Sequence, residues 1–291
     1  MCLYTKKGKT KPMNSNKQKK IFSENYALIT GAAGLLGEEH AIALLEIKKN
    51  IILTDINSKK LEILKKRLKK KFKTNEIYSL KMDVAKESSI INAWKNLKKK
   101  KITIDVLINN AAIDPKFTSN QNNARATRFE YFSVKNWEKE FSVGLTGAIL
   151  CSKIFGRELI KKKTKGVILN IASDLSIISP NQNIYKIRNT KSSKQPVKPI
   201  SYSVIKHGII GLTKYLATYW APENIRCNAL SPGPVLNLQS KSLINKLKKL
   251  IPMERLANKN EYKSAIKFLC TDESSYMTGQ NVIIDGGRST W

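Results

Sequence analysis

The sequence predicts a single α/β domain with a doubly wound parallel sheet and helices on both faces. Short apolar runs alternate with longer segments of helical spacing from residue 26 onward. This alternation favours right-handed crossovers between parallel strands. A glycine-rich turn lies between the first strand and the first helix. A chain of 291 residues can bury the core that one such domain requires.

Each expected element follows from its own pattern. Strands are recognised as short apolar runs, and helices as segments with an apolar residue at every third or fourth position. We expect strands at residues 26–30, 50–55, 77–82, 104–109, 166–172, 225–230 and 282–285. We expect helices at residues 38–47, 58–72, 87–98, 134–162, 202–219 and 261–270.

Three segments fall outside this alternation. Residues 1–24 carry seven lysines and little apolar content, which predicts a disordered basic arm before a domain at residues 25–291. Residues 114–132 are polar, and residues 176–200 form a long insertion with three prolines. Both loops would leave the carboxyl ends of strands, where open α/β sheets bind ligands.

Cysteine usage and hydropathy indicate a cytoplasmic protein without a metal site. Cys2, Cys151, Cys227 and Cys270 are dispersed, and the chain has only two histidines. The amino-terminal arm lacks the apolar core of a signal peptide, and no later run is long enough to span a membrane.

The formal charge of +31 raises the possibility of nucleic-acid binding. However, 45 of the 53 basic residues are lysines, and they occupy helix-surface positions throughout the chain without interleaved aromatic residues. A lysine-biased, solvated surface explains this pattern better than a specific nucleic-acid site. Weak polyanion binding at low salt is expected in either case.

The glycine turn has the context of a dinucleotide-binding site. Gly31, Gly34 and Gly37 would permit tight backbone, close approach of a pyrophosphate and helix packing. Asp55 lies 18 residues after Gly37 at the end of the next strand, where a carboxylate can accept both hydroxyls of an adenosine ribose. Its charge would repel a 2'-phosphate, so NAD is favoured over NADP. Asp55 could instead cap the following helix.

Tyr202 and Lys206 are four residues apart and would share one helix face. A cation about 4 Å from a phenolate stabilises it by about 4 kcal/mol, which would lower the pKa of the phenol by roughly three units. The pKa of Tyr202 would then approach neutrality, as a general acid/base for an alcohol or ketone requires. The same spacing can also arise by chance in so lysine-rich a chain.

These motifs together resemble the short-chain dehydrogenase/reductase family over residues 25–291, which implies a single-domain Rossmann fold. The resemblance rests on residues 30–37, 83–84, 109–112, 170–173, 202–206, 231–235 and 285–287. It implies that Ser173, Tyr202 and Lys206 are catalytic: Ser173 would bind the reacting oxygen, Tyr202 would exchange its proton, and Lys206 would tune Tyr202. The cofactor-binding residues that it implies are Gly31, Gly34, Leu36, Gly37, Asp55, Asp83, Val84, Asn110, Ala111, Ala112, Tyr202, Lys206, Pro232, Gly233 and Val235.

Two departures from the family pattern stand out. Gly144 occupies the position of an asparagine that usually helps to hold a water chain, and the glycine would leave room for another water. Ser173 and Tyr202 are 29 positions apart, so the 176–200 insertion must loop out if they are to meet. Together with residues 173–176, 195–199 and 285–291, this insertion resembles that of a subgroup associated with bacterial surface-glycan and flagellin-sugar modification.

Charged residues near the expected site suggest how a substrate could be held. The insertion carries Lys186, Arg188, Lys191, Lys194 and Lys198, with Tyr185 available to stack on a ring. These residues would suit a phosphorylated or nucleotide-linked sugar, although lysine is abundant everywhere in the chain. Arg288 and Trp291 at the carboxyl end are expected to reach a neighbouring subunit's cleft or to pack at a subunit interface.

The leading hypothesis is an NAD-dependent enzyme that moves a hydride between nicotinamide and a secondary alcohol or ketone, on a sugar derivative. By resemblance, the helices at 134–162 and 202–219 would form a homodimer or homotetramer. One alternative is a 3-ketoacyl-type or other small-carbonyl reductase, which Asp55 and the polar insertion disfavour. The other is a non-catalytic dinucleotide-binding regulator, suggested by Gly144.

Overall fold

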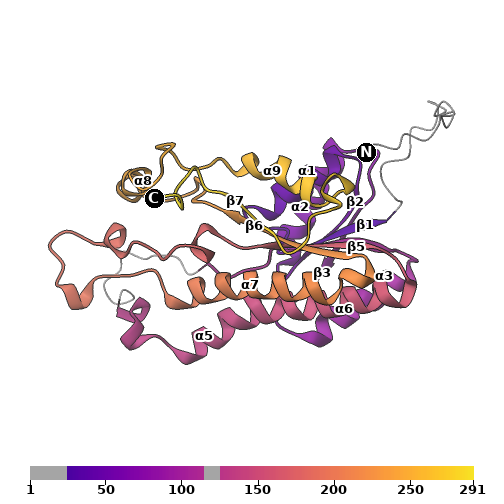
Figure 1. The fold of residues 1–291 in the computed structure, drawn as a ribbon, viewed down its shortest axis with the longest axis horizontal. Helices are drawn as coiled ribbons and strands as arrows, with labels where there is room; N and C mark the ends of the chain where they lie inside the picture. Colours follow the sequence, from indigo (N-terminus) through magenta and orange to yellow (C-terminus); the bar gives the residue numbers. More distant parts are fainter. Residues whose placement is uncertain (1–24, 115–124) are drawn as a thin grey trace, which may run out of the picture.

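The computed structural model describes residues 25–114 and 125–291, and its sheet is parallel throughout. The strand order is β3-β2-β1-β4-β5-β6-β7 (Figure 1). The strands are β1 (Tyr26–Thr30), β2 (Asn50–Asp55), β3 (Ile77–Lys81), β4 (Ile104–Asn109), β5 (Gly166–Ile171), β6 (Ile225–Pro232) and β7 (Asn281–Ile284). The order reverses its direction of growth between β1 and β4, which is the switch point where such sheets bind ligands. The predicted fold class is confirmed.

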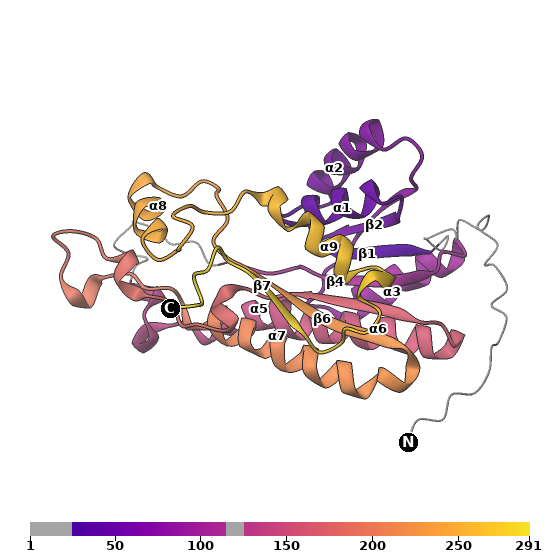
Figure 2. The same ribbon diagram turned by 45° about the horizontal axis from the view of Figure 1, so that its top comes forward.

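Helices cover both faces of the sheet (Figures 1 and 2). They are α1 (Gly37–Glu46), α2 (Ser58–Lys71), α3 (Glu87–Lys99), α5 (Val134–Phe141), α6 (Gly147–Lys162), α7 (Ile200–Tyr219), α8 (Lys241–Lys248) and α9 (Lys263–Leu269). Helices α1, α2 and α9 pack on one face, and α3, α6 and α7 pack on the other.

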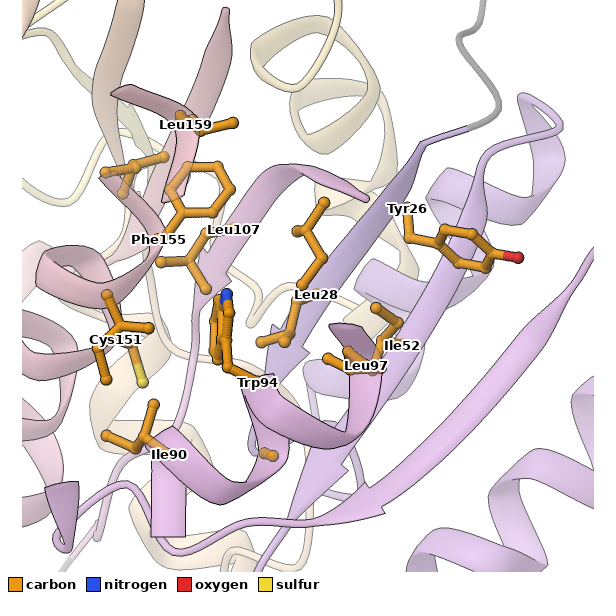
Figure 3. Packing of buried hydrophobic residues seen from close by; sticks show 14 of the residues in the cluster. Tyr26, Leu28, Ile52, Ile90, Trp94, Leu97, Leu107, Cys151, Phe155 and Leu159 are labelled. Carbon is orange, nitrogen blue, oxygen red and sulfur yellow. The ribbon is translucent and has the colours of Figure 1, made fainter. Parts of the chain in front are cut away.

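The core consists of two apolar layers because successive strand residues point to opposite faces. In β1, Leu28 faces α3 and α6, whereas Ala27 and Ile29 face α1. Trp94 of α3 and Phe155 of α6 pack near Leu28 on the first of these faces (Figure 3). Strands buried on both faces explain the near-continuous apolar runs of the sequence.

The helix expected at residues 134–162 is interrupted. A π-helical turn, Ser142–Thr146, separates α5 from α6, and buried Gly144 lies at its centre. Hydropathy alone could not reveal this turn, because the apolar spacing continues through it. Single π turns often mark functional sites, and this one packs against α7.

Helix α8 at residues 241–248 was not expected from the sequence. The Ser240 side chain accepts a hydrogen bond from the backbone of Leu243 and begins the helix. Ile184 of the insertion packs with Leu247, Ile251 and Leu256 in a small cluster outside the main core. The insertion, α8 and the carboxyl terminus lie on the same side of the molecule (Figure 1).

Residues 1–24, the expected basic arm, lie outside the described residues, as do residues 115–124 of the expected 114–132 loop. Across residues 25–114 and 125–291, no helix has the length and apolar content needed to cross a bilayer. The same ranges contain no group of three or more potential metal-ligating His, Cys, Asp or Glu side chains.

Candidate functional site

The glycine turn joins β1 to α1 and is tightly packed. Gly31 has φ +60, a left-handed conformation that favours glycine, and a Cβ added there would lie 2.8 Å from the Cα of Ala111. A Cβ at Gly37 would collide with the carbonyl oxygen of Gly31. These two glycines therefore bring the turn close to the end of β4 and to the amino end of α1.

Thr30 and Asn110 fasten the turn to β4. The Thr30 hydroxyl oxygen accepts hydrogen bonds from the backbone N–H groups of Asn110 and Ala111, both at 3.0 Å. The Asn110 side chain donates to the carbonyl oxygens of Thr30 and Gly31, also at 3.0 Å. Ala112 follows on the same exit from β4. The predicted residues 110–112 thus border the turn, and Asn110 supports it directly.

Asp55 at the end of β2 contacts the turn as well. Its carboxylate accepts from the backbone N–H of Ala33 at 3.1 Å and from that of Asn57 at 2.8 Å. Asn57, whose side chain accepts from the backbone of Lys60, caps α2. Asp55 therefore does not have the helix-capping role that the sequence left open, and its carboxylate lies beside the turn.

The surroundings of the turn fit a bound dinucleotide. The two acids in the first turn of α1 are both paired with cations, Glu38 with Arg67 at 2.5 Å and Glu39 with Lys259 at 2.9 Å. Their charge is thus offset where the helix dipole would favour a pyrophosphate. Leu36, half-buried, precedes α1 and completes the predicted turn.

The other predicted cofactor residues lie at neighbouring strand ends. Asp83 follows β3 and accepts from the backbone N–H of Ala85 at 3.1 Å, while Val84 is buried. Pro232 ends β6, and the backbone N–H of Gly233 donates to Ile284 at 2.9 Å. Val235 forms an isolated bridge with Ala257.

The insertion loops out as expected, and Ser173, Tyr202 and Lys206 come together. Ser173 follows β5, and the other two residues lie on α7. Ser173 lies close enough to Tyr202 to affect the pKa of its phenol. The Lys206 ammonium lies 5.7 Å from the centre of the Tyr202 ring and donates to the carbonyl oxygen of Ile171 at 2.7 Å. The three residues that the sequence singled out therefore lie in one cluster.

The expectation that the pKa of Tyr202 approaches neutrality was wrong for the protein chain alone. Burial raises the pKa of the phenol above its ordinary value, and the charge of Asp114 raises this pKa further, although the nearby Ser173 side chain lowers it. Burial also lowers the pKa of Lys206 to about 8. Desolvation outweighs the attraction between the two groups because their separation exceeds that of a direct contact.

One basic residue of the insertion reaches the cluster. The Lys198 ammonium lies 4.0 Å from the centre of the Tyr202 ring and 2.6 Å from a carboxylate oxygen of Asp114. Its side chain is only 14% exposed. The remaining basic residues of the insertion, Lys186, Arg188, Lys191 and Lys194, are exposed. Of the several cations expected to line the site, only Lys198 does so, and Asp114 was not expected there.

Gly144 does not leave the space for water that the sequence suggested. A Cβ added at Gly144 would lie 2.8 Å from the Cγ2 methyl group of Ile205 on α7. The β-branched side chain of Ile205 has little rotamer freedom in a helix, so the methyl group fills this position.

The expectation that Arg288 lies at a subunit interface or in a neighbour's cleft was also wrong. Arg288 is 7% exposed and pairs with Asp174 of its own chain at 2.5 Å. Trp291 is exposed and donates from its indole nitrogen to the carbonyl oxygen of Leu250 at 3.3 Å. Asp174 directly follows Ser173, but only the fold could show which cation pairs with it.

Comparisons with known proteins agree with this architecture. The family model described as enoyl-(acyl carrier protein) reductase matches residues 31–289. The chain is 29% identical to NAD-dependent glycerol dehydrogenase of Listeria innocua, covering 91% of this chain and 94% of that protein. It is also 29% identical to post-translational flagellin modification protein A of Campylobacter coli, covering 89% and 96%.

A solved structure shows the same fold with a cofactor. A short-chain dehydrogenase from Leptospira borgpetersenii, crystallised with bound NAD+, superposes with a TM-score of 0.80 at 28% identity. The match covers 97% of this chain and all of that one.

Proposed function

The chain belongs to the short-chain dehydrogenase/reductase family, and from that premise we propose that it transfers a hydride between NAD and a secondary alcohol or ketone of a sugar derivative. Its relatives include dehydrogenases and reductases that act on alcohols or ketones. One observation carries the proposal. Ser173, Tyr202 and Lys206 lie close together at the carboxyl end of β5, on the side of the sheet where the glycine turn also lies.

Bound NAD would supply the hydride acceptor for oxidation of an alcohol, and NADH the donor for reduction of a ketone. In the reductive direction, Tyr202 would donate its phenolic proton to the oxygen that becomes an alcohol. Its raised pKa keeps the phenol protonated at neutral pH, as this role requires. Ser173 would hold the same oxygen by a hydrogen bond, and the Lys206 cation would stabilise the phenolate left behind.

The preference for NAD rests on Asp55, because its carboxylate stands beside the turn where an adenosine 2'-phosphate would meet negative charge. Replacing it in Asp55→Asn should shift the ratio of kcat/KM values for NAD and NADP toward NADP by about tenfold, or about 1.4 kcal/mol. An unchanged ratio would show that Asp55 does not select the cofactor.

A sugar derivative is the proposed substrate class because the contacts near Tyr202 are polar and charged. Lys198 and Asp114 flank the Tyr202 ring, which would favour hydroxyl or phosphate groups over an acyl chain. Two relatives have compatible names, the glycerol dehydrogenase and the flagellin modification protein. We further propose that a surface-glycan or flagellin sugar is modified.

The decisive experiment is NADH formation or consumption across a panel of polyols, phosphosugars and nucleotide sugars. Turnover by the wild type with loss of at least about 1,000-fold in Tyr202→Phe, at unchanged NAD affinity, would support the proposal. NAD binding without turnover on any member would favour a dinucleotide-binding regulator instead.

The role of Lys198 in substrate binding is tested by charge reversal, with Lys194 as the matched control. Lys194 belongs to the same insertion but is exposed. If a phosphosugar is the substrate, Lys198→Glu should raise its KM about tenfold more than that of the neutral analogue, and Lys194→Glu should change neither. Equal effects on the two substrates would show that Lys198 does not bind phosphate.

We also propose a homo-oligomer, because α6 and α7 expose apolar side chains. Ile149 of α6 and Val204, Tyr215 and Tyr219 of α7 are all more than one-third exposed, and the two tyrosine rings stack at 5.6 Å. Light scattering should show a dimer or tetramer, and Tyr215→Glu with Tyr219→Glu should reduce its size. A wild-type monomer at micromolar concentration would contradict this proposal.

A further inference from the structure

A buried ion pair stands directly behind Ser173. Asp174 and Arg288 are 3% and 7% exposed, and they join the first residues after β5 to the segment after β7. One carboxylate oxygen of Asp174 accepts from the Arg288 guanidinium at 2.5 Å. The other accepts from the Ser173 hydroxyl and from the backbone N–H of Leu175, both at 2.8 Å. Both oxygens of Asp174 are therefore engaged.

This arrangement sets the direction of the Ser173 hydroxyl in this structure. A carboxylate only accepts hydrogen bonds, so the single hydroxyl hydrogen of Ser173 must point to Asp174. The hydroxyl oxygen then accepts from the backbone N–H of Leu175 at 3.2 Å. In this orientation Ser173 has no hydrogen left to donate to a ketone oxygen or a developing alkoxide.

Arg288 is held in place by the fold of the carboxyl-terminal segment. The Asp285 carboxylate accepts from the backbone N–H groups of Gly287 at 2.9 Å and Ser289 at 2.8 Å. Gly286 accepts from the backbone of Met253 at 3.2 Å, so the segment lies along the chain that follows α8. The guanidinium is thus presented to Asp174 by a fixed turn.

We propose that Asp174 and Arg288 are positioning residues that control the hydroxyl of Ser173. The Asp174 carboxylate orients the hydroxyl. Arg288 pairs with Asp174 and weakens it as a hydrogen-bond acceptor, so that the hydroxyl can turn to the substrate oxygen. An unpaired carboxylate is the stronger acceptor and would keep the hydroxyl turned away. The inference rests on the proposed function of Ser173 in hydride transfer.

Removal of Arg288 provides the first test, measured as single-turnover NADH formation so that slow variants can be compared. Arg288→Met should lower the rate about tenfold or more while NAD affinity stays within about twofold. Adding Asp174→Asn to that variant removes the unpaired charge and should restore the rate to within about threefold of wild type.

The second test asks whether the pair acts through Ser173. In a Ser173→Ala background, Arg288→Met should change the residual rate by less than about twofold. If Arg288→Met does not fold, because it leaves a buried charge unpaired, Arg288→Lys takes its place. Arg288→Lys keeps the cation but lacks the planar fork, so we expect a loss of about threefold that also disappears in Ser173→Ala. The matched control is Arg255→Met, which removes the exposed pair with Glu261 and should leave the rate unchanged.

The outcomes separate this inference from the proposed function. A Ser173→Ala variant as fast as wild type would overturn both. If Ser173→Ala is slow, the coupling is overturned when neither Arg288 variant changes the rate, or when their losses persist undiminished in Ser173→Ala. It is also overturned if Asp174→Asn does not restore the rate of a folded Arg288→Met.

Discussion

At the scale of single residues, Gly144 shows how closely α7 approaches the π turn. An asparagine there would force its Cβ against the Ile205 methyl group, so Gly144→Asn should lower the free energy of unfolding by about 1–3 kcal/mol. The added change Ile205→Ala should recover part of this loss by making space. Urea unfolding measures both effects. Gly211→Asn, where an added Cβ meets nothing within 4 Å, is the control on α7. Equal stability of Gly144→Asn and wild type would contradict the packing argument.

His40 should make stability depend on pH. Its side chain on α1 is fully buried, neither ring nitrogen has a hydrogen-bond partner within residues 25–114 and 125–291, and burial lowers the pKa of the ring to about 4. The unfolded chain, with a pKa near 6.5, then takes up protons more readily than the folded one. The stabilising effect of neutral His40 is complete above about pH 6.5 and is lost as pH falls toward 4, with about 2 kcal/mol gone at pH 5.

Urea unfolding at pH 7.5 and pH 5 tests this expectation. His40→Gln does not titrate in this range, so its stability should fall by about 2 kcal/mol less than that of wild type between the two conditions. His207→Gln removes the other histidine, which is exposed, and should behave like wild type. The expectation fails if all three proteins lose equal stability.

The order of the site motifs could be predicted at this scale, but not their energetics. Tyr202 and Lys206 were recognisable because four positions along a helix return to the same face. The raised pKa of Tyr202 could not be predicted from the sequence, because it depends on burial and on Asp114, which comes from another strand end. The same reasoning applies to Arg288, whose partner Asp174 lies 114 positions away in the sequence.

At the scale of elements, the insertion and α8 support each other at the edge of the candidate site. Ile184 and Leu247 share a small apolar cluster, and the Lys246 ammonium donates to the carbonyl oxygen of Lys186 at 2.8 Å. Within the insertion, the Gln195 side chain bonds to both backbone groups of Ile187. Lys198, at the end of the insertion, is thereby brought to Tyr202.

We therefore expect Leu247→Ala to raise the substrate KM severalfold while leaving NAD affinity unchanged. The truncation removes part of the small cluster and should loosen the insertion. A Leu→Ala change at a fully packed position lowers the free energy of unfolding by about 2–5 kcal/mol. Steady-state kinetics measures the effect. The control is Leu64→Ala on α2. Leu64 lies in the main core and not in the small cluster, so this change should lower stability without changing KM. Parallel effects of the two variants on KM would contradict a local role.

At the scale of the whole molecule, the charge of +31 predicts salt-sensitive, non-specific affinity for polyanions. Fluorescence anisotropy with a labelled DNA duplex should show binding at about 20 mM salt and at least a tenfold weaker affinity at about 150 mM. Duplexes of different sequence should bind equally. Sequence-selective affinity that survives physiological salt would contradict the view that the lysines form a solvated surface.

The sequence by itself determined the fold class, the order of the strands along the chain and the position of the glycine turn after the first strand. These depend on local periodicity and on glycines needed at fixed positions, which a single chain displays directly. Only the tertiary structure decided that Ile205 fills the space beside Gly144, that Lys198 is the insertion's cation at Tyr202, and that Arg288 pairs with Asp174. Those contacts join residues from distant strand ends, and their burial and distance, which set the electrostatics of the site, exist only once the sheet brings the strand ends together.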